Sequence, residues 1–167
     1  MGPRAPGGDD DFARADGMGK GLARYAAAAL PALTFEDRAD VGGIGFEVVL
    51  APHQWKIADG WRMSPVLTRW LLRDRTTWLH AVRVGRQLWF GTPCDFSGEL
   101  ANELSLAFAE SGVMAEVCSF NGDYVGYVLP DRYAGMPTYE TRVMNWFGPA
   151  TGSYFRDLMN RMGTLLT

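Results

Sequence analysis

The sequence predicts an α/β protein in which a layered mixed sheet is flanked by helices. Segments with the alternating apolar pattern of strands are followed by segments with helical spacing, an order typical of layered α/β folds. The 167 residues suffice for one domain with its own core, and a hydrophobic fraction of 47% is ordinary for a globular protein. We predict a loop or tail over residues 1–10, rich in Gly, Pro and Asp, and one α/β domain over residues 11–167.

The first predicted elements are a helix and a strand. A helix should begin at Asp11 and end at Pro31, with acidic residues early and Lys20 and Arg24 later, as the helix dipole favours. The apolar residues of this helix at near-helical spacing are Phe12, Met18, Leu22, Tyr25 and Leu30. Residues 43–51, GIGFEVVLA, alternate with a period of two and predict a strand, with Ile44, Phe46, Val48 and Leu50 on one side.

Local signals also predict the later elements. Residues 64–74 predict a short helix capped by Ser64, and residues 77–93 predict a hairpin that turns at Gly85-Arg86. The clearest helix covers residues 96–112, where Ser97 caps the start and Gly112 supplies the stop. Its shared apolar face consists of Leu100, Leu104 and Phe108. A strand over residues 113–121 and a final helix over residues 148–162 complete the alternation.

Composition and motifs exclude several function classes. The net charge is −3 with a pI near 5.3, and the basic residues are scattered, so we expect no nucleic-acid partner. No apolar run approaches the roughly 20 residues of a transmembrane helix, and we expect no such segment. The sequence contains no GxSxG elbow, Walker loop or GxGxxG fingerprint, and His53 and His80 lack metal-ligand spacing. Whether Cys94 and Cys118 pair, and in which compartment the chain works, stay open.

The most unusual segment is NGDYVGYVLPDRYAGMPTYE, residues 121–140, with four tyrosines, three glycines and two prolines. It follows a predicted strand, and Asp95 follows another just before a helix begins, so Asp95, Tyr124 and Tyr127 are expected to face one crevice at the strand ends. Two alternatives stay open. The first is that the tyrosines are half-buried aromatics that cover a core. The second is that Asp95 only stabilises the helix N-terminus through its charge.

Three blocks of the sequence resemble the neutral, non-lysosomal ceramidases. AVRVGRQLWFGTPCDFSGELANEL resembles the family's hairpin strand, P-G-E turn and helix. The segment of residues 121–140 resembles its N-x-Y-x-x-Y and Y-E motifs, and WFGPATGSYFRDLM resembles its closing F/Y-G-P and helix. The match covers residues 78–162, with a weaker block at DFARADGMGKGLA. The resemblance implies a zinc amidohydrolase acting on N-acyl sphingoid lipids, and it implies that this chain is the C-terminal half of a larger catalytic domain.

The resemblance also assigns roles to residues. It implies that Asp95, in place of the family's glutamate, and Tyr127 are zinc ligands, and that Tyr139 hydrogen-bonds the scissile carbonyl oxygen. Tyr124 and Tyr133 would pack or line the cleft as substrate-binding residues. Zinc with an open coordination position lowers the pKa of bound water to about 7, and a phenol aimed at the developing oxyanion adds stabilisation. The family's two histidine ligands have no counterpart in this sequence, so we expect weak or absent zinc binding by this chain alone.

Three hypotheses follow. The chain is one portion of a ceramidase-like hydrolase that needs a histidine-bearing N-terminal half, and the isolated chain then exposes an apolar face and self-associates or is marginally stable. Alternatively it is a non-catalytic module whose aromatic loop and tryptophans contact a lipid-like ligand or a partner protein. Those tryptophans are Trp61, Trp70, Trp89 and Trp146. A metal-free hydrolase ranks last, because no activated nucleophile is apparent.

Overall fold

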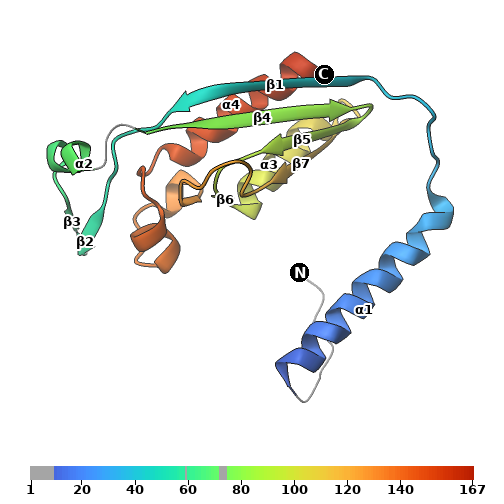
Figure 1. Ribbon diagram of the computed structural model, residues 1–167, viewed down its shortest axis with the longest axis horizontal. Helices are drawn as coiled ribbons and strands as arrows, with labels where there is room; N and C mark the ends of the chain where they lie inside the picture. Colours follow the sequence, from blue (N-terminus) through green and yellow to red (C-terminus); the bar gives the residue numbers. More distant parts are fainter. Residues whose placement is uncertain (1–9, 59, 72–74) are drawn as a thin grey trace. The chain divides into compact units, whose positions relative to one another are not determined.

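The computed structural model describes residues 10–58, 60–71 and 75–167 (Figure 1). The chain forms two compact units, Met1–Arg38 and Ala39–Thr167. The first contains α1 (Asp11–Ala29) and a 3₁₀ turn at Leu30–Ala32, which confirms the predicted helix. Asp10 caps α1 by accepting a hydrogen bond from Ala13 N at 2.7 Å. The predicted loop over residues 1–10 lies, except for Asp10, outside the described residues.

Helix α1 has a stripe of apolar side chains that are exposed among the described residues of its own unit. The most exposed of them are Phe12 at 88%, Tyr25 at 82% and Leu22 at 73%, and no residue of the helix is buried. The spacing that predicts the helix therefore says nothing about what packs against it.

The second unit is built on a four-stranded mixed sheet with the order β1-β4-β5-β7. Strands β1 (Val41–Val49), β4 (Thr76–Val84) and β5 (Gln87–Gly91) pair antiparallel, and β7 (Met114–Cys118) pairs parallel to β5. The turn between β4 and β5 is Gly85-Arg86, with Gly85 at φ 56°. The predicted strands, hairpin and α/β class are therefore confirmed.

Two helices pack against the four-stranded sheet. Helix α3 (Gly98–Ala109) connects β5 to β7, and the Ser97 side chain accepts from Glu99 N at its start. Helix α4 (Thr151–Leu166) packs beside α3 and against β1 and β4. A shorter helix, α2 (Pro65–Leu71), begins where it was predicted, while residues 72–74 of that prediction lie outside the described residues.

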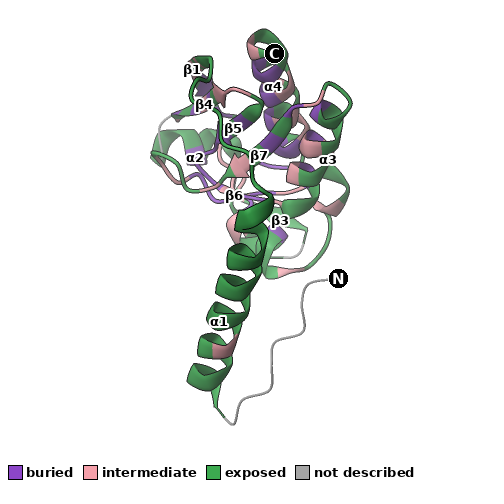
Figure 2. Ribbon diagram, turned by 90° about the vertical axis from the view of Figure 1, so that its right-hand side faces the viewer, coloured by how far each residue is buried: buried purple, intermediate pink, exposed green. Residues whose placement is uncertain are grey.

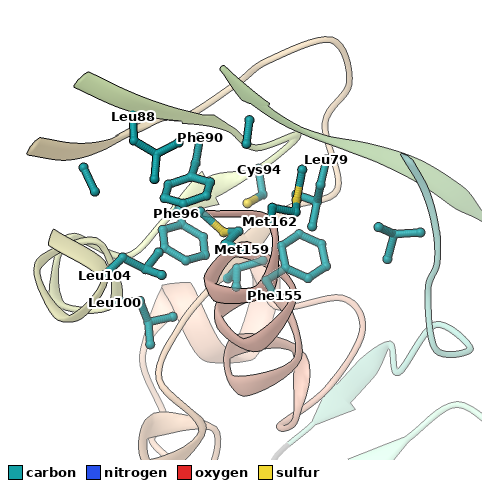
Figure 3. Packing of buried hydrophobic residues seen from close by; sticks show 14 of the residues in the cluster. Leu79, Leu88, Phe90, Cys94, Phe96, Leu100, Leu104, Phe155, Met159 and Met162 are labelled. Atoms are coloured by element: carbon teal, nitrogen blue, oxygen red, sulfur yellow. The ribbon is translucent and has the colours of Figure 1, made fainter. Parts of the chain in front are cut away.

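Helices α3 and α4 cover one face of the sheet (Figure 2). Alternate strand residues such as Leu79, Leu88 and Phe90 point into this layer and are fully buried. They meet helix side chains that are also buried, as Figure 3 shows: Leu100, Leu104, Phe155, Met159 and Met162. The burial of these side chains between sheet and helices accounts for the compactness of the second unit.

The opposite face of the sheet is exposed and carries large apolar side chains. We call the group Trp78, Val82, Trp89 and Met114 the open face. Their exposed fractions are 50%, 41%, 45% and 54%, and Val82 and Trp89 are register partners on neighbouring strands. A solvated sheet face is normally polar at these alternate positions. The open face therefore has the composition of a surface that another layer covers.

Several short elements were not predicted. They are β2 (Lys56–Ala58) paired with β3 (Trp61–Arg62), β6 (Asp95–Phe96) paired with β8 (Tyr127–Val128), a 3₁₀ turn at Asp131–Tyr133 and a π-helix at Glu140–Met144. Strands of two or three residues show no measurable period, so only their tertiary pairing defines them. None of the helices in the described part of the chain has the length and hydropathy of a membrane-spanning segment.

Candidate active site

The candidate site lies where β5 and β7 end. The segments that leave these parallel strands run side by side and exchange backbone hydrogen bonds. Asn121 N donates to Thr92 O at 2.8 Å, Val125 N to Pro93 O at 2.7 Å, and Asp95 N to Gly126 O at 3.0 Å. The carboxyl ends of neighbouring parallel strands are the usual position of ligand sites in α/β sheets.

The short parallel pair of β6 and β8 places Asp95 directly opposite Tyr127. The two residues are 32 positions apart in the sequence. The Tyr127 phenol donates a hydrogen bond to the Asp95 carboxylate, and this bond, together with the carboxylate's negative charge, raises the pKa of Tyr127. The structure thus brings together the two residues that the resemblance pairs.

Two further tyrosines lie around this pair. The Tyr139 ring meets the Tyr127 ring edge-on, with centroids 6.3 Å apart, and Tyr139 is 59% exposed. Burial, followed by the Asp95 charge and the neighbouring Tyr139, raises the pKa of Tyr124. The predicted crevice residues Asp95, Tyr124 and Tyr127 therefore form one electrostatically connected group, and Tyr139 joins it.

An aromatic wall beside the tyrosines was not predicted as a unit. Tyr124 stacks on Phe120 at 5.8 Å and meets Trp146 edge-on at 5.6 Å. His53 continues the wall, 6.1 Å from the Trp146 ring and 4.5 Å from the Phe147 ring. Burial, followed by the nearby Arg75 charge, lowers the pKa of His53, which favours its neutral form.

Phe120 has a strained backbone. Its φ of 61° lies in the left-handed region, which is rare for a bulky residue, and its ring is 61% exposed. Its N–H donates to Cys94 O at 3.1 Å, so the loop holds the conformation in place. Strain of this kind is concentrated at functional sites because only a surrounding structure that demands it will maintain it. No local signal in the sequence indicates this conformation.

Asp123 anchors residues 121–140, which we call the tyrosine segment, to the start of β4. Its carboxylate accepts from Arg75 at 2.7 Å, from Thr77 at 3.0 Å and from the backbone N–H of Tyr124 at 2.7 Å. Burial acts to raise the pKa of Asp123, but these hydrogen bonds and the Arg75 charge outweigh it and lower the pKa. The carboxylate is therefore a charged clamp one residue before Tyr124.

Two glycines allow the segment to pack closely. Gly126 has a φ of 81°, and a Cβ there would lie 2.3 Å from Met144 O. A Cβ on Gly152 of α4 would lie 2.1 Å from Leu129 O. Asp131 adds a cap by accepting from Ser153 N and Ser153 Oγ at 3.1 and 2.6 Å. The tyrosine segment is thus fixed to β4 near its start and to α4 near its middle.

Fold comparisons match this arrangement to known structures. The neutral ceramidase from Pseudomonas aeruginosa superimposes with a TM-score of 0.67 over 98% of this chain and 34% of the ceramidase chain, at 14% identity. A ceramidase complexed with C2 superimposes with a TM-score of 0.65 over 95% of this chain and 35% of its own, at 13% identity.

The chain has the fold of part of a neutral ceramidase. It spans about a third of the length of those solved ceramidase chains. No protein-family model and no curated protein sequence matches the chain. The resemblance to the neutral ceramidases is therefore confirmed at the level of fold, while the roles of individual residues stay predictions.

The remaining predicted or considered residues lie as follows. Tyr133 is half-buried, with the Arg132 guanidinium 4.9 Å above its ring. His80 lies on β4 beside Trp78, with ring centroids 6.1 Å apart. Neither cysteine is in a disulfide. Burial is the main cause that raises the pKa of Cys94 to about 12, which argues against a nucleophilic role.

The ligand set for zinc is partial. Among the residues that the structure describes, no three His, Cys, Asp or Glu side chains come together as a metal site. Asp95 and Tyr127 offer two adjacent oxygens, whereas zinc sites in proteins hold three or four ligands. The described residues therefore fit half of a zinc site and do not fit a complete one.

Proposed function

We propose that this chain contributes one half of the catalytic site of a neutral ceramidase-like amide hydrolase, which acts on N-acyl sphingoid or related lipids. The observation that carries the proposal is the pairing of Asp95 with Tyr127 across β6 and β8, with Tyr139 against the Tyr127 ring. The ceramidase fold around this group supports it.

Each residue has a specific part in this proposal. The Asp95 and Tyr127 oxygens are two ligands for a zinc ion whose remaining ligands are histidines from another polypeptide segment. The exposed Tyr139 phenol donates a hydrogen bond to the carbonyl oxygen of the amide, which gains negative charge as the bond is cleaved. Tyr124 and Phe120 supply an apolar wall against which an acyl chain lies. Tyr133 stays a predicted cleft residue.

The phenol proton of Tyr127 predicts how the half-site responds to pH. A metal ion bound by both oxygens replaces that proton, so binding releases it. Because the pKa of Tyr127 is raised, the phenol is protonated at neutral pH. Zinc affinity should therefore rise by about tenfold for each pH unit while this release accompanies binding.

Zinc titration with and without imidazole tests the half-site. We expect weak binding by the chain alone, since two oxygen ligands rarely hold zinc, and tighter binding when imidazole replaces the missing histidines. A variant with Asp95→Asn and Tyr127→Phe should lose the imidazole-dependent binding, while Tyr133→Phe, which removes a phenol from the same segment, should keep it. Calorimetry in two buffers of different ionisation enthalpy measures the proton release.

Two results would overturn the proposal. The first is zinc affinity that is the same in the double variant as in the original chain. The second is hydrolysis of detergent-dispersed N-acylsphingosine by the chain alone that persists in Tyr139→Phe, because the catalytic group would then lie elsewhere. Circular dichroism of each variant verifies that the fold is retained.

The open face supports the requirement for a second polypeptide segment. Four large apolar side chains are exposed on one side of a sheet whose other side is fully packed. The ceramidase chains with this fold are about three times as long, so their fold includes polypeptide that this chain does not match. We propose that a segment equivalent to that polypeptide covers the open face and brings the histidines.

A second candidate is a binding module without catalysis. The observation that favours it is the aromatic wall of Phe120, Tyr124, Trp146 and His53, whose rings contact one another directly. Saturable binding of the metal-free chain to vesicles that contain N-acylsphingosine, weakened by Phe120→Ala and unaffected by Tyr154→Ala on α4, would support it. Equal binding by both variants would argue against it.

A further inference from the structure

Strand β1 lies at one edge of the four-stranded sheet (Figure 1). It pairs with β4 along nine consecutive residues without a register shift, and no strand in the described part of the second unit pairs with its other side. Edge strands of globular proteins are usually shortened, bulged or interrupted by Pro or Lys, because an open edge pairs readily with other strands. Strand β1 has none of these features, and Glu47 is its one charged residue.

The hydrogen bonds at the two ends of β1 show which of its backbone groups point away from β4. Leu50 N donates to Arg75 O at 3.1 Å, and Gly85 N donates to Asp40 O at 2.8 Å. Such hydrogen-bonded pairs recur at every second residue of an antiparallel ladder, and the register between these two ends is continuous. The even-numbered residues of β1 therefore bond to β4, and the N–H and C=O groups of its odd-numbered residues point outward.

The five outward-pointing residues of β1 are all exposed. They are Val41, Gly43, Gly45, Glu47 and Val49. The Glu47 carboxylate accepts a hydrogen bond from Thr76 Oγ1 at 2.6 Å, which holds it on the side of the open face. This edge therefore presents a continuous row of backbone donors and acceptors that only two small apolar side chains and one acid accompany.

A second copy of β1, running antiparallel, is complementary to this edge. A two-fold axis through Gly45 sets Gly43 opposite Glu47 of the other copy, and it sets Val41 opposite Val49. All five outward-pointing residues then form hydrogen-bonded pairs, since odd-numbered residues face odd-numbered ones. The single charge of β1 meets a glycine, so no like charges are opposed, and two β-branched residues meet at each end.

The same pairing extends the packed layer beneath the sheet. Ile44 and Phe46 point toward the helices and pack against the core, but they stay only half-buried. In the pairing centred on Gly45, Ile44 of one copy lies opposite Phe46 of the other, so each covers apolar surface that the other leaves exposed. Identical surfaces that meet about a two-fold axis form a closed dimer and not a growing filament.

We propose that β1 is a dimerisation edge, at which two copies of this chain pair antiparallel about Gly45 and join their four-stranded sheets. This inference does not rest on the hydrolase proposal, because no residue of β1 belongs to the group of Asp95 and the tyrosines. It also differs from association through the open face, since Trp89 lies on β5 and β4 separates that strand from β1.

Charge substitutions at position 43 test both the dimer and its register. A Cβ on Gly43 would make only ordinary contacts, with Ala81 O at 3.6 Å and Val82 Cγ2 at 4.0 Å, so a side chain fits there. Gly43→Lys places an ammonium opposite Glu47 of the other copy, whereas Gly43→Glu places a like charge there. Relative to the neutral Gly43→Gln, we expect Gly43→Lys to tighten the dimer by about two- to tenfold and Gly43→Glu to weaken it by a similar factor. Sedimentation velocity over a range of concentrations measures the dissociation constant.

Two controls separate this effect from that of net charge. Ala107→Lys and Ala107→Glu make the same charge changes at an exposed position on α3 and should leave the dimer affinity nearly unchanged. Glu47→Gln should remove the gain of Gly43→Lys, because the antiparallel pairing about Gly45 brings these two positions together. Circular dichroism of each variant verifies that the fold is retained. Equal effects at positions 43 and 107, or a gain that survives Glu47→Gln, would overturn the proposal.

Hydrogen exchange of the original chain, followed by NMR, is a second measurement that needs no substitution. The N–H groups of Gly43, Gly45 and Glu47 should exchange rapidly in dilute samples and slowly in concentrated ones, while those of Ile44 and Phe46 stay protected in both. A chain that remains monomeric at millimolar concentration would overturn the proposal. A dimer in which exchange at the three odd-numbered residues is unchanged would overturn it in favour of a contact elsewhere, such as the open face.

Discussion

The two faces of the four-stranded sheet are made by alternate residues of the same strands, yet only one is covered. Leu88 on β5 is fully buried under the helices, while its neighbour Trp89 points the other way and is 45% exposed. Both are large apolar residues that favour burial. The difference shows that the sequence is apolar on both faces, whereas the described part of the second unit supplies a covering layer for one.

The largest effect expected from this comparison is on the covered face. Leu88→Ala should lower the free energy of unfolding by about 2–5 kcal/mol, because it leaves a cavity beneath α3 in a packed layer. Urea denaturation followed by circular dichroism measures the change. A loss below about 1 kcal/mol would mean that the layer adjusts freely and that the two faces differ less than their burial indicates.

An intermediate effect is expected at the clamp between the sheet and the tyrosine segment. Asp123→Asn should cost about 1 kcal/mol, since the carboxylate accepts three hydrogen bonds but remains partly exposed. The folded-state pKa of Asp123 is lowered, so its contribution is present above the unfolded pKa of about 3.9 and is lost as the pH falls through the folded pKa.

Unfolding of the original chain and of Asp123→Asn across pH measures this dependence. The difference between them should be constant between about pH 5 and 7 and should shrink below about pH 4. The more exposed Asp157, substituted by Asn, serves as the control and should show a smaller difference. A difference in the free energy of unfolding that grows toward acid pH would contradict the stabilising role of the charged Asp123 carboxylate.

The smallest effect on stability is expected on the open face. Trp89→Thr should change the free energy of unfolding by less than about 1 kcal/mol, because nearly half of the side chain is already exposed. It should nevertheless reduce self-association, which sedimentation velocity over a range of concentrations measures. Glu116→Thr, at the register partner on β7, is the polar control. Equal association of the original chain and Trp89→Thr would show that the open face makes no contact between copies.

Local signals predicted most of the second unit. The caps, the turn at Gly85 and the apolar face of α3 depend on residues that are close together in the sequence, so they could be predicted from the sequence alone. The pairing of β6 with β8 was beyond such reasoning, because two-residue strands have no pattern of their own. The resemblance, not the spacing, selected Asp95 and Tyr127 as ligands, and the topology then brought them together.

The aromatic wall is a part of the candidate site that could not be predicted from the sequence. Phe120, Trp146 and His53 come from three separate loops, and only tertiary packing makes them neighbours. The left-handed backbone at Phe120 is likewise imposed by the hydrogen bonds of its surroundings. In α1, spacing predicted the helix correctly, but its four large apolar residues and Leu30 in the following turn remain exposed, since periodicity does not identify a partner.

The parallel pairing of β6 with β8 has a consequence for the order of folding. Asp95 and Tyr127 meet only after α3 and β7 have closed the crossover between them, because every residue of that crossover lies between the two in the chain. Such non-local parallel pairings form slowly relative to the helix and hairpin next to them. The pairing of Asp95 with Tyr127 therefore reports that this crossover is complete, and its appearance during refolding would time the formation of the two-stranded β6–β8 sheet.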